Sequence, residues 1–327
     1  MSDRHPSAVR LIDESVSRFG PRVLLSETHD EVVGVTSRAR AVTYAEVGAD
    51  ARKLASGLYA TGLERGARVA VLLENSPELV ATEWACLISG LVWVGLNVRT
   101  SAAELQRLVD DCGPAALLYG AQLRELAQAV RLPEGSLRIL VAPDGAEWMR
   151  LLAVGGAASR PSLTAPGPSE PVRIRYTSGT AGTPKGAVLP RRCYDASVTS
   201  VRDVVGPLGG DDVVVHVAPM THASGARRLP HAAVGARAVL LRHFDGRELI
   251  AVVERERATA VFLVPTGTAA NALARASHLN PSISSRICGS SPTRPAGLGW
   301  RGTCGPVQSV SDQPVVPGRL QWLAQLV

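Results

Sequence analysis

The sequence lacks the cysteine spacings that usually build metal sites or disulfide frameworks. No CxxC pair and no nearby histidine ligand pattern accompanies its five cysteines, Cys86, Cys112, Cys193, Cys288 and Cys304. An odd number of cysteines without such spacings argues against both kinds of site. Cys86 and Cys112 fall within apolar helical patterns, which favours buried thiols in a reducing compartment. No metal-ligating residue is therefore expected.

Long apolar runs are also missing. The N-terminal stretch MSDRHPSAVRLIDE contains no apolar segment of the kind found in secretory signals. The longest apolar candidate, 84–98, is too short to cross a bilayer and contains two glycines. We therefore expect a cytoplasmic protein without a transmembrane segment.

Clusters of one charge sign are absent as well. Lys plus Arg number 35 against 29 Asp plus Glu, a formal net charge of +6, but the basic residues are scattered. A scattered excess fits a protein that handles small anions and argues against a nucleic-acid-binding stripe. The 327 residues, 46% of them hydrophobic and 20% charged, are enough for a globular fold with a large core.

The sequence does contain alternating strand and helix patterns. A capping box formed by Thr43 and Glu46 opens a helix whose apolar positions recur at helical spacing until Gly62. Five further elements follow it: a strand at 68–73, a helix from Ser76 to about Gly90, a strand at 91–96, a helix opened by a second capping box at 101–104, and a strand near 115–119. This alternation predicts a parallel sheet that is covered on both faces.

A second α/β unit is expected after a connecting segment. The segment from about Gly155 to Glu170 is rich in Gly, Pro, Ser and Ala, which predicts an exposed connection. Beyond it the patterns indicate strands at 213–219, 238–241 and 260–265 and an amphipathic helix at 246–258. We expect one subdomain with the N-terminal segment (1–170), a loop region with a second subdomain (171–291), and a divergent tail that loses periodicity (292–327).

The stretch YTSGTAGTPKG at 176–186 sets three glycines and several hydroxyl side chains beside Lys185. Following a strand-like VRIRY, such a loop lets backbone amides and hydroxyls surround an anion while the lysine supplies charge. A Walker A loop is disfavoured because Pro184 precedes the lysine and Gly186 follows it. A phosphate loop and a plain glycine-rich turn both remain open at this point.

The longer string YTSGTAGTPKGAVLP closely resembles the phosphate-binding loop of the adenylate-forming (AMP-binding) superfamily, which includes acyl-CoA synthetases, peptide-synthetase adenylation domains and luciferases. The region 42–119 and the later segments VAPMTHASG, RERATAVFLVPT and ICGSSP are similar to further landmarks of that family in the right order. The resemblance covers roughly residues 15 to 300. It implies an α/β fold with two related parallel-sheet subdomains, those of the family's large N-terminal domain.

The resemblance implies ATP-dependent activation of a carboxylic acid to an acyl-adenylate, followed by acyl transfer to coenzyme A. Medium- or long-chain fatty acids are the first expectation and aryl acids the second; the expected cofactors are ATP, Mg²⁺ and coenzyme A.

It also assigns candidate residues. Lys185 and Thr180 are the expected catalytic residues, and His222 is expected in the acyl pocket, although a strand-end hydrogen bond is its plainer interpretation. The residues expected to bind the nucleotide are Thr177, Ser178, Gly179, Gly182 and Thr183 at the phosphates and Gly289, Ser290, Ser291 and Pro292 at the adenine. Arg227 and Arg228 stand where relatives carry apolar residues. They could shorten or polarise the acyl site or point to solvent, and we expect them to face solvent.

The resemblance breaks down near the C-terminus. Relatives have a Tyr-Gly-x-Thr-Glu motif whose Glu helps to hold Mg²⁺, whereas VSDQP stands at 310–314 here. The ribose-binding Asp and the small C-terminal domain with its catalytic Lys also lack a counterpart. We therefore expect a C-terminally truncated member, produced by a frameshift near residue 300, with little or no activity. A non-catalytic nucleotide- or acyl-binding protein is the alternative hypothesis.

Overall fold

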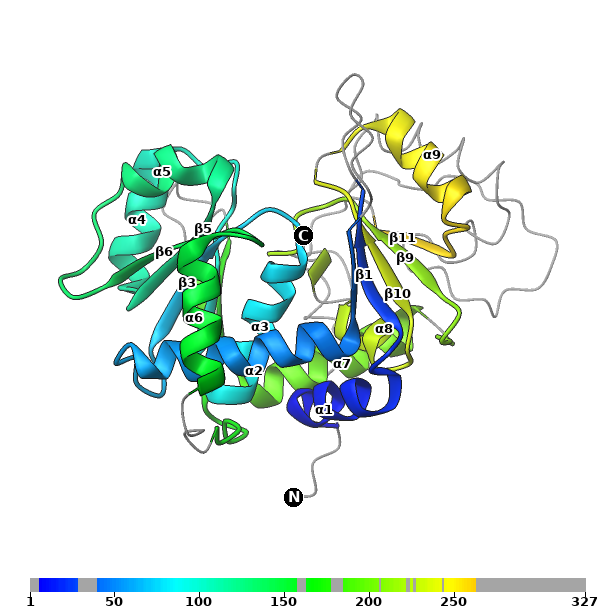
Figure 1. Ribbon diagram of the computed structural model, residues 1–327, viewed down its shortest axis with the longest axis horizontal. Coiled ribbons are helices and arrows are strands. Elements are labelled where there is room, and N and C mark those ends of the chain that lie inside the picture. Colours follow the sequence, from blue (N-terminus) through cyan, green and yellow to red (C-terminus); the bar gives the residue numbers. More distant parts are fainter. Residues whose placement is uncertain are drawn as a thin grey trace, which may run out of the picture.

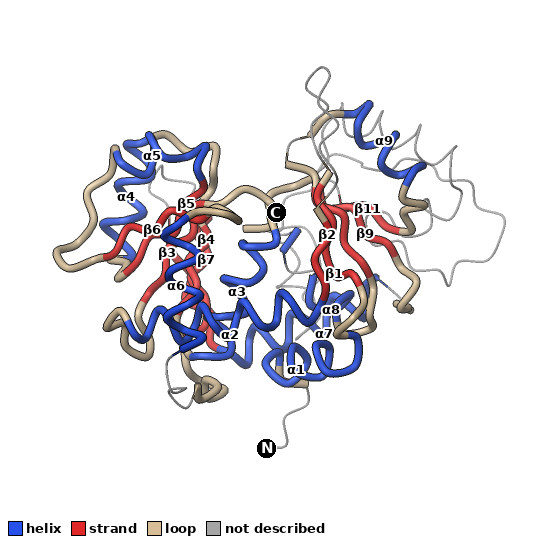
Figure 2. Tube along the Cα trace, viewed as in Figure 1, coloured by secondary structure: helices blue, strands red, loops and turns tan. Residues whose placement is uncertain are grey.

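The computed structural model describes residues 6–28, 40–157, 163–177, 185–205, 207–221, 224–225, 228–242 and 244–262. Figures 1 and 2 show two sheets with helices between them and on their outer faces. The helices are α1 Ala8–Phe19, α2 Tyr44–Ala60, α3 Pro77–Ser89, α4 Ala102–Cys112, η1 Ala121–Leu123, α5 Arg124–Gln128, α6 Ala146–Ala157, α7 Arg191–Val205, α8 Arg228–Ala232 and α9 Gly246–Arg255.

The strands fall into two sheets that are mainly parallel. One sheet has the order β6-β5-β3-β4-β7-β8 and the other the order β11-β9-β10-β1-β2. Only the end pairs β7–β8 and β1–β2 are antiparallel among the described strands. The strand bounds are β1 Val23–Glu27, β2 Ala41–Thr43, β3 Arg68–Leu72, β4 Val92–Gly95, β5 Ala116–Gly120, β6 Leu137–Val141, β7 Pro171–Thr177, β8 Lys185–Pro190, β9 Val213–His216, β10 Arg237–Leu240 and β11 Ala260–Phe262.

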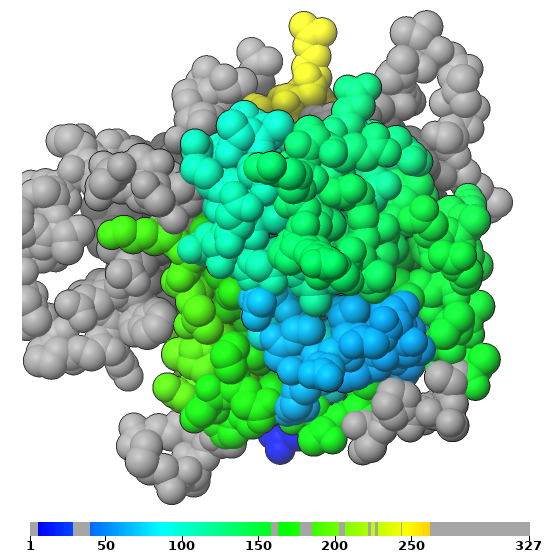
Figure 3. All heavy atoms as spheres, turned by 90° about the vertical axis from the view of Figure 1, so that its left-hand side faces the viewer, coloured from blue at the N-terminus to red at the C-terminus, as the bar shows by residue number. Residues whose placement is uncertain are grey.

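The main core lies between the two sheets. Strand β3 shows the arrangement, because Val69 and Val71 join the core around α1, α2 and α3 while Ala70 and Leu72 face α4. On the far face of the other sheet, α9 covers a separate apolar cluster. The layers are therefore helix, sheet, helix, sheet, helix. A space-filling view from the side of the first sheet shows the teal and green atoms of the chain from α4 to α6 in the upper part of that face (Figure 3).

Local signals that the sequence predicted are present at the helix ends. Thr43 and Glu46 form the expected capping box at the start of α2. Ser76 caps α3 by accepting a hydrogen bond from the Leu79 amide, Pro77 occupies the first turn, and Gly90 ends the helix in the left-handed conformation. Every residue of α3 is buried, so this helix forms the centre of the molecule.

The sheets do not follow the division that we expected at residue 170. The N-terminal strands β1 and β2 belong to the sheet of the second unit, where β1 pairs with β10 in parallel. The hairpin β7–β8 belongs instead to the first sheet, where β7 pairs with β4. Strand patterns reveal buried faces but not pairing partners, so they could not show this exchange.

The connection expected from about Gly155 to Glu170 begins later than predicted. Helix α6 continues to Ala157, and Gly155 is buried against α2. A β-carbon on Gly155 would lie 1.8 Å from the Lys53 carbonyl oxygen, and one on Gly57 would lie 2.4 Å from the Leu151 carbonyl oxygen. These glycines therefore allow α2 and α6 to approach closely. The composition of the segment that begins at Gly155 had instead predicted a loop.

The cysteines that were expected to be buried are buried in the structure. Cys86 and Cys112 are buried free thiols, and burial raises the pKa of Cys112 to about 11. None of the helices in the described part of the chain combines the length and apolar character needed to span a bilayer.

Candidate functional site

The β7–β8 hairpin places Lys185 at the end where its strands open. In the antiparallel register Thr177, the last residue of β7, lies opposite Lys185, the first residue of β8. The Lys185 side chain is exposed to solvent. The expected phosphate-binding residues between them lie outside the described residues: Ser178, Gly179, Thr180, Gly182 and Thr183. Lys185 and the backbone of Thr177 thus mark the two ends of the candidate loop.

Tyr176 fixes the hairpin to helix α4. Its hydroxyl donates a 2.5 Å hydrogen bond to Asp111 Oδ2 on α4. Burial, followed by this hydrogen bond to the carboxylate, raises the pKa of Tyr176. Gly186 lies beneath the ring, because a β-carbon there would come within 3.0 Å of Tyr176 Cε1. The small residue after Lys185 is therefore needed for packing beside the loop.

A second part of the site is the segment that follows β9. Asn75, in the connection between β3 and α3, holds it through its amide group: Nδ2 donates to the carbonyl oxygens of Ala218 at 3.2 Å and Leu241 at 3.1 Å. Its Oδ1 accepts a hydrogen bond from the Met220 amide at 2.8 Å. One buried side chain thus connects the first sheet to the ends of two strands of the second.

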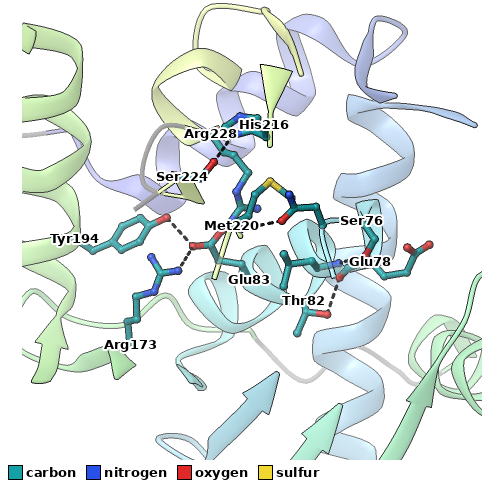
Figure 4. Close-up of polar contacts among 12 residues, drawn as sticks. Ser76, Glu78, Thr82, Glu83, Arg173, Tyr194, His216, Met220, Ser224 and Arg228 are labelled. Carbon is teal, nitrogen blue, oxygen red and sulfur yellow. Dashed lines mark hydrogen bonds and ion pairs between the residues drawn. The ribbon is translucent and has the colours of Figure 1, made fainter. Parts of the chain in front are cut away.

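The same segment is fixed again a few residues later. His216 Nδ1 lies 2.8 Å from Ser224 Oγ in a buried contact (Figure 4). Gly225 packs so closely that a β-carbon would lie 1.9 Å from the Met220 carbonyl oxygen. His222, the expected acyl-pocket residue, lies outside the described residues between these two anchors.

A buried ionic cluster lies beside this segment, and sequence reasoning missed it. Glu83 on α3 contacts Arg173 on β7 at 3.3 Å, accepts a 3.1 Å hydrogen bond from Tyr194 on α7, and forms an ion pair with Arg228 on α8 (Figure 4). The Arg173 guanidinium also lies over the Trp93 ring, 4.2 Å from its centroid. Burial and the Glu83 charge raise the pKa of Tyr194.

The cluster corrects the expectation for Arg228. This side chain is buried at 6% exposure rather than facing solvent, because Glu83 in the wholly buried α3 requires a cation. Arg227 lies outside the described residues. The position of Glu83 inside the apolar stretch LVATEWACLI (79–88) was the signal that such a partner had to exist.

The remaining predicted residues cannot be placed. The expected adenine loop, Gly289, Ser290, Ser291 and Pro292, and the tail after it lie outside the described residues. Within the described ranges, His, Cys, Asp and Glu side chains form no group of three or more that could hold a metal ion.

The sequence of this chain is similar to those of known CoA ligases. A family model described as AMP-binding enzyme matches residues 22–310. Feruloyl-CoA synthase from Amycolatopsis sp. is 33% identical over 266 residues, covering 80% of this chain and 51% of that protein. Long-chain-fatty-acid–CoA ligase FadD13 from Mycobacterium tuberculosis (strain ATCC 25618 / H37Rv) is 28% identical over 229 residues, covering 68% of this chain and 44% of that protein. The chain thus spans about half the length of the curated relatives it matches.

A solved structure confirms the fold. The long-chain-fatty-acid-CoA ligase FadD1 from Archaeoglobus fulgidus has a TM-score of 0.70 at 22% identity, covering 84% of this chain and 54% of that one. The predicted α/β architecture with two mainly parallel sheets is therefore correct, although two strand pairs change sheets relative to the expected division.

Proposed function

Because the chain belongs to the AMP-binding enzyme family, we propose that it activates a carboxylic acid with ATP and transfers the acyl group to coenzyme A. The observation that carries the proposal is the exposed Lys185 directly opposite Thr177, where the β7–β8 hairpin opens. A cation at this position suits the phosphates of a nucleotide held by the intervening glycine- and hydroxyl-rich loop.

In the proposed first step, a carboxylate oxygen of the acid attacks the α-phosphorus of ATP. The new oxygen–phosphorus bond forms as the bond to the leaving pyrophosphate breaks, and Lys185 with the loop donors stabilises the charge on that pyrophosphate. In the second step the thiol of coenzyme A attacks the acyl carbon, loses its proton, and displaces AMP. Bound Mg²⁺ would neutralise phosphate charge, but no described residue is assigned to hold it.

Lys185 and Thr180 remain the proposed catalytic residues, with Thr177, Ser178, Gly179, Gly182 and Thr183 as phosphate contacts. His222 is proposed for the acyl pocket on the resemblance of the segment VAPMTHASG. The adenine is assigned to Gly289, Ser290, Ser291 and Pro292 on the sequence alone. A cytoplasmic location is proposed from the buried free thiols Cys86 and Cys112.

A fatty acid is the proposed substrate class and an aryl acid its competitor. The two curated relatives point to different classes, since one is named for feruloyl-CoA and the other for long-chain fatty acids.

The test is pyrophosphate release by the full chain in the presence of ATP, Mg²⁺ and a panel of fatty and aryl acids. The chain offers a matched control, because Lys53 and Lys185 are its two lysines. We expect any release to be slow, because VSDQP stands at 310–314 in place of the relatives' Mg²⁺-binding motif. Acid-dependent release that falls about 10²–10³-fold in Lys185→Ala, and not in Lys53→Ala, supports the proposal. Saturable ATP binding without any release would instead favour the non-catalytic binding protein.

A further inference from the structure

Three arginines surround a single carboxylate between β7, α3 and α8. Arg173 and Arg175 are two residues apart on β7, so their side chains leave the same face of the strand. Arg173 and Arg228 contact Glu83, and Arg175 interacts electrostatically with Arg173, Glu83 and Tyr194. Within the described residues, ion pairs join these arginines to Glu83 and to no other carboxylate.

The charges of this group do not balance. Three guanidinium groups and one carboxylate give 3 − 1 = +2, in a place where Arg173 and Arg228 are 2% and 6% exposed. Several buried nitrogens make no hydrogen bond among the described residues, namely Arg173 Nη1, Arg175 Nε, and Arg228 Nε and Nη1, and Arg173 Nη2 has only its 3.3 Å ion-pair contact with Glu83. Buried cations in excess of their counterions are costly, so the group favours an additional anion.

The half-buried Arg175 is the member that most needs such an anion. Burial, and then the like charge of Arg173, lowers the pKa of Arg175 to about 10. Arg173 is partly compensated by the Trp93 ring, whereas no ion pair within the described residues involves Arg175. A planar oxyanion can accept the forked donors of a guanidinium, which makes carboxylate a well-matched ligand.

We propose that Arg175 and Arg228, together with Arg173, bind a second carboxylate at the far end of the acid substrate. This inference rests on the proposed function and narrows its substrate class to a medium-chain dicarboxylic acid. Arg175 and Arg173 precede Thr177 by two and four residues, which is about 7 and 13 Å along an extended strand. A diacid of about six to eight carbons is comparable in length to these spacings.

The test measures the thermal stability of the full chain without nucleotide, at constant ionic strength, with adipate, suberate, hexanoate, octanoate or pyrophosphate. We expect the diacids to raise Tm more than the monoacids of equal length. In Arg175→Met the diacid dissociation constant should rise at least about tenfold, because charge-assisted hydrogen bonds are lost. Arg175→Lys, which keeps the charge but not the fork, should give an intermediate value, and Arg255→Met, an exposed control on α9, should resemble the wild type.

Three results would overturn the proposal: equal stabilisation by diacids and monoacids, an unchanged diacid effect in Arg175→Met, or stabilisation by pyrophosphate alone, which would make this a phosphate site. Without any anion, Arg175→Met should have a higher Tm than the wild type, because a buried like charge has been removed. Diacid binding with no acid-dependent pyrophosphate release would refute the ligase function and leave the carboxylate site intact, so the two failures are distinguishable.

Discussion

Lys185 lies opposite Thr177 in the antiparallel ladder that joins β8 to β7. This pairing closes the base of the segment 178–184 and leaves the lysine side chain in solvent, where it can meet a ligand. Tyr176 and Gly186 hold the neighbouring rung against Asp111 of α4. The register of the hairpin thus places Lys185 opposite Thr177.

The first prediction concerns nucleotide binding. ATP should raise the Tm of the wild type, and Lys185→Ala should lose most of this protection, since a charge-assisted contact to phosphate is worth about 1.5–3 kcal/mol. Thermal unfolding with and without ATP measures the effect, and Lys53→Ala on α2 is the control. Equal protection of Lys185→Ala and the wild type would show that the phosphates bind elsewhere.

The second prediction concerns the contact between α2 and α6. Gly155→Ala should lower the free energy of unfolding by at least about 2 kcal/mol, because its β-carbon would lie 1.8 Å from the Lys53 carbonyl oxygen and backbone has to move. Its neighbour is a matched control: a β-carbon on Gly156 would lie 4.0 Å from its nearest contact, Lys53 Cγ. Gly156→Ala should be neutral or stabilise the helix by up to about 1 kcal/mol. Urea unfolding of the two variants checks the order, and a reversed order would refute the close packing.

The third prediction concerns Asn75. Asn75→Asp keeps an acceptor for the Met220 amide but loses both donors, and it brings a carboxylate against the carbonyl oxygens of Ala218 and Leu241. We expect the free energy of unfolding to fall by about 2–4 kcal/mol. Asn97→Asp should cost little, since the Arg99 amide donates to an oxygen that Asp retains. Similar stabilities for the two variants in denaturant titrations would contradict a bridging role for Asn75.

The fourth prediction concerns acid stability. Hydrogen bonds from the Thr43 amide and hydroxyl hold the pKa of Glu46 below its ordinary value. The ionised form is therefore favoured in the folded state, and its contribution is complete above the unfolded pKa of about 4.3 and lost as the pH falls through the folded pKa. The stability difference between the wild type and Glu46→Gln should shrink as the pH falls from about 6 to about 3. A difference that grows on acidification, measured by urea unfolding at each pH, would reverse the sign and refute the assignment.

Much of the fold could be predicted from the sequence because buried strands and helices have recognisable local patterns of apolar residues. The strands at 68–72 and 92–95 are buried on both faces, and the helix between them carries recognisable caps at Ser76 and Gly90. The pairing partner of a strand has no such local pattern. The edge hairpin β7–β8 and the N-terminal strands β1 and β2 join their sheets through contacts with strands distant in the sequence. Gly155 was misread for a related reason, because a loop and a close helix contact favour the same small residue.

The candidate site could be predicted only in part. The phosphate loop has a dense local motif, and the structure places the two residues that bound it, Thr177 and Lys185, opposite each other. The cluster of Glu83, Arg173 and Arg228 draws its members from distant positions, so no stretch of sequence contains it. For this reason Arg228 was wrongly predicted to face solvent, although it is buried against Glu83.

The most direct test of the central claim is affinity labelling with an ATP analogue that carries an amine-reactive group on its terminal phosphate. Lys53 and Lys185, the two lysines of the chain, give a simple peptide map after digestion and mass spectrometry. We predict that Lys185 is labelled and that excess ATP protects it, while labelling of Lys53 is weak and insensitive to ATP. Equal labelling of both lysines without protection by ATP would contradict the placement of the nucleotide phosphates at the β7–β8 hairpin.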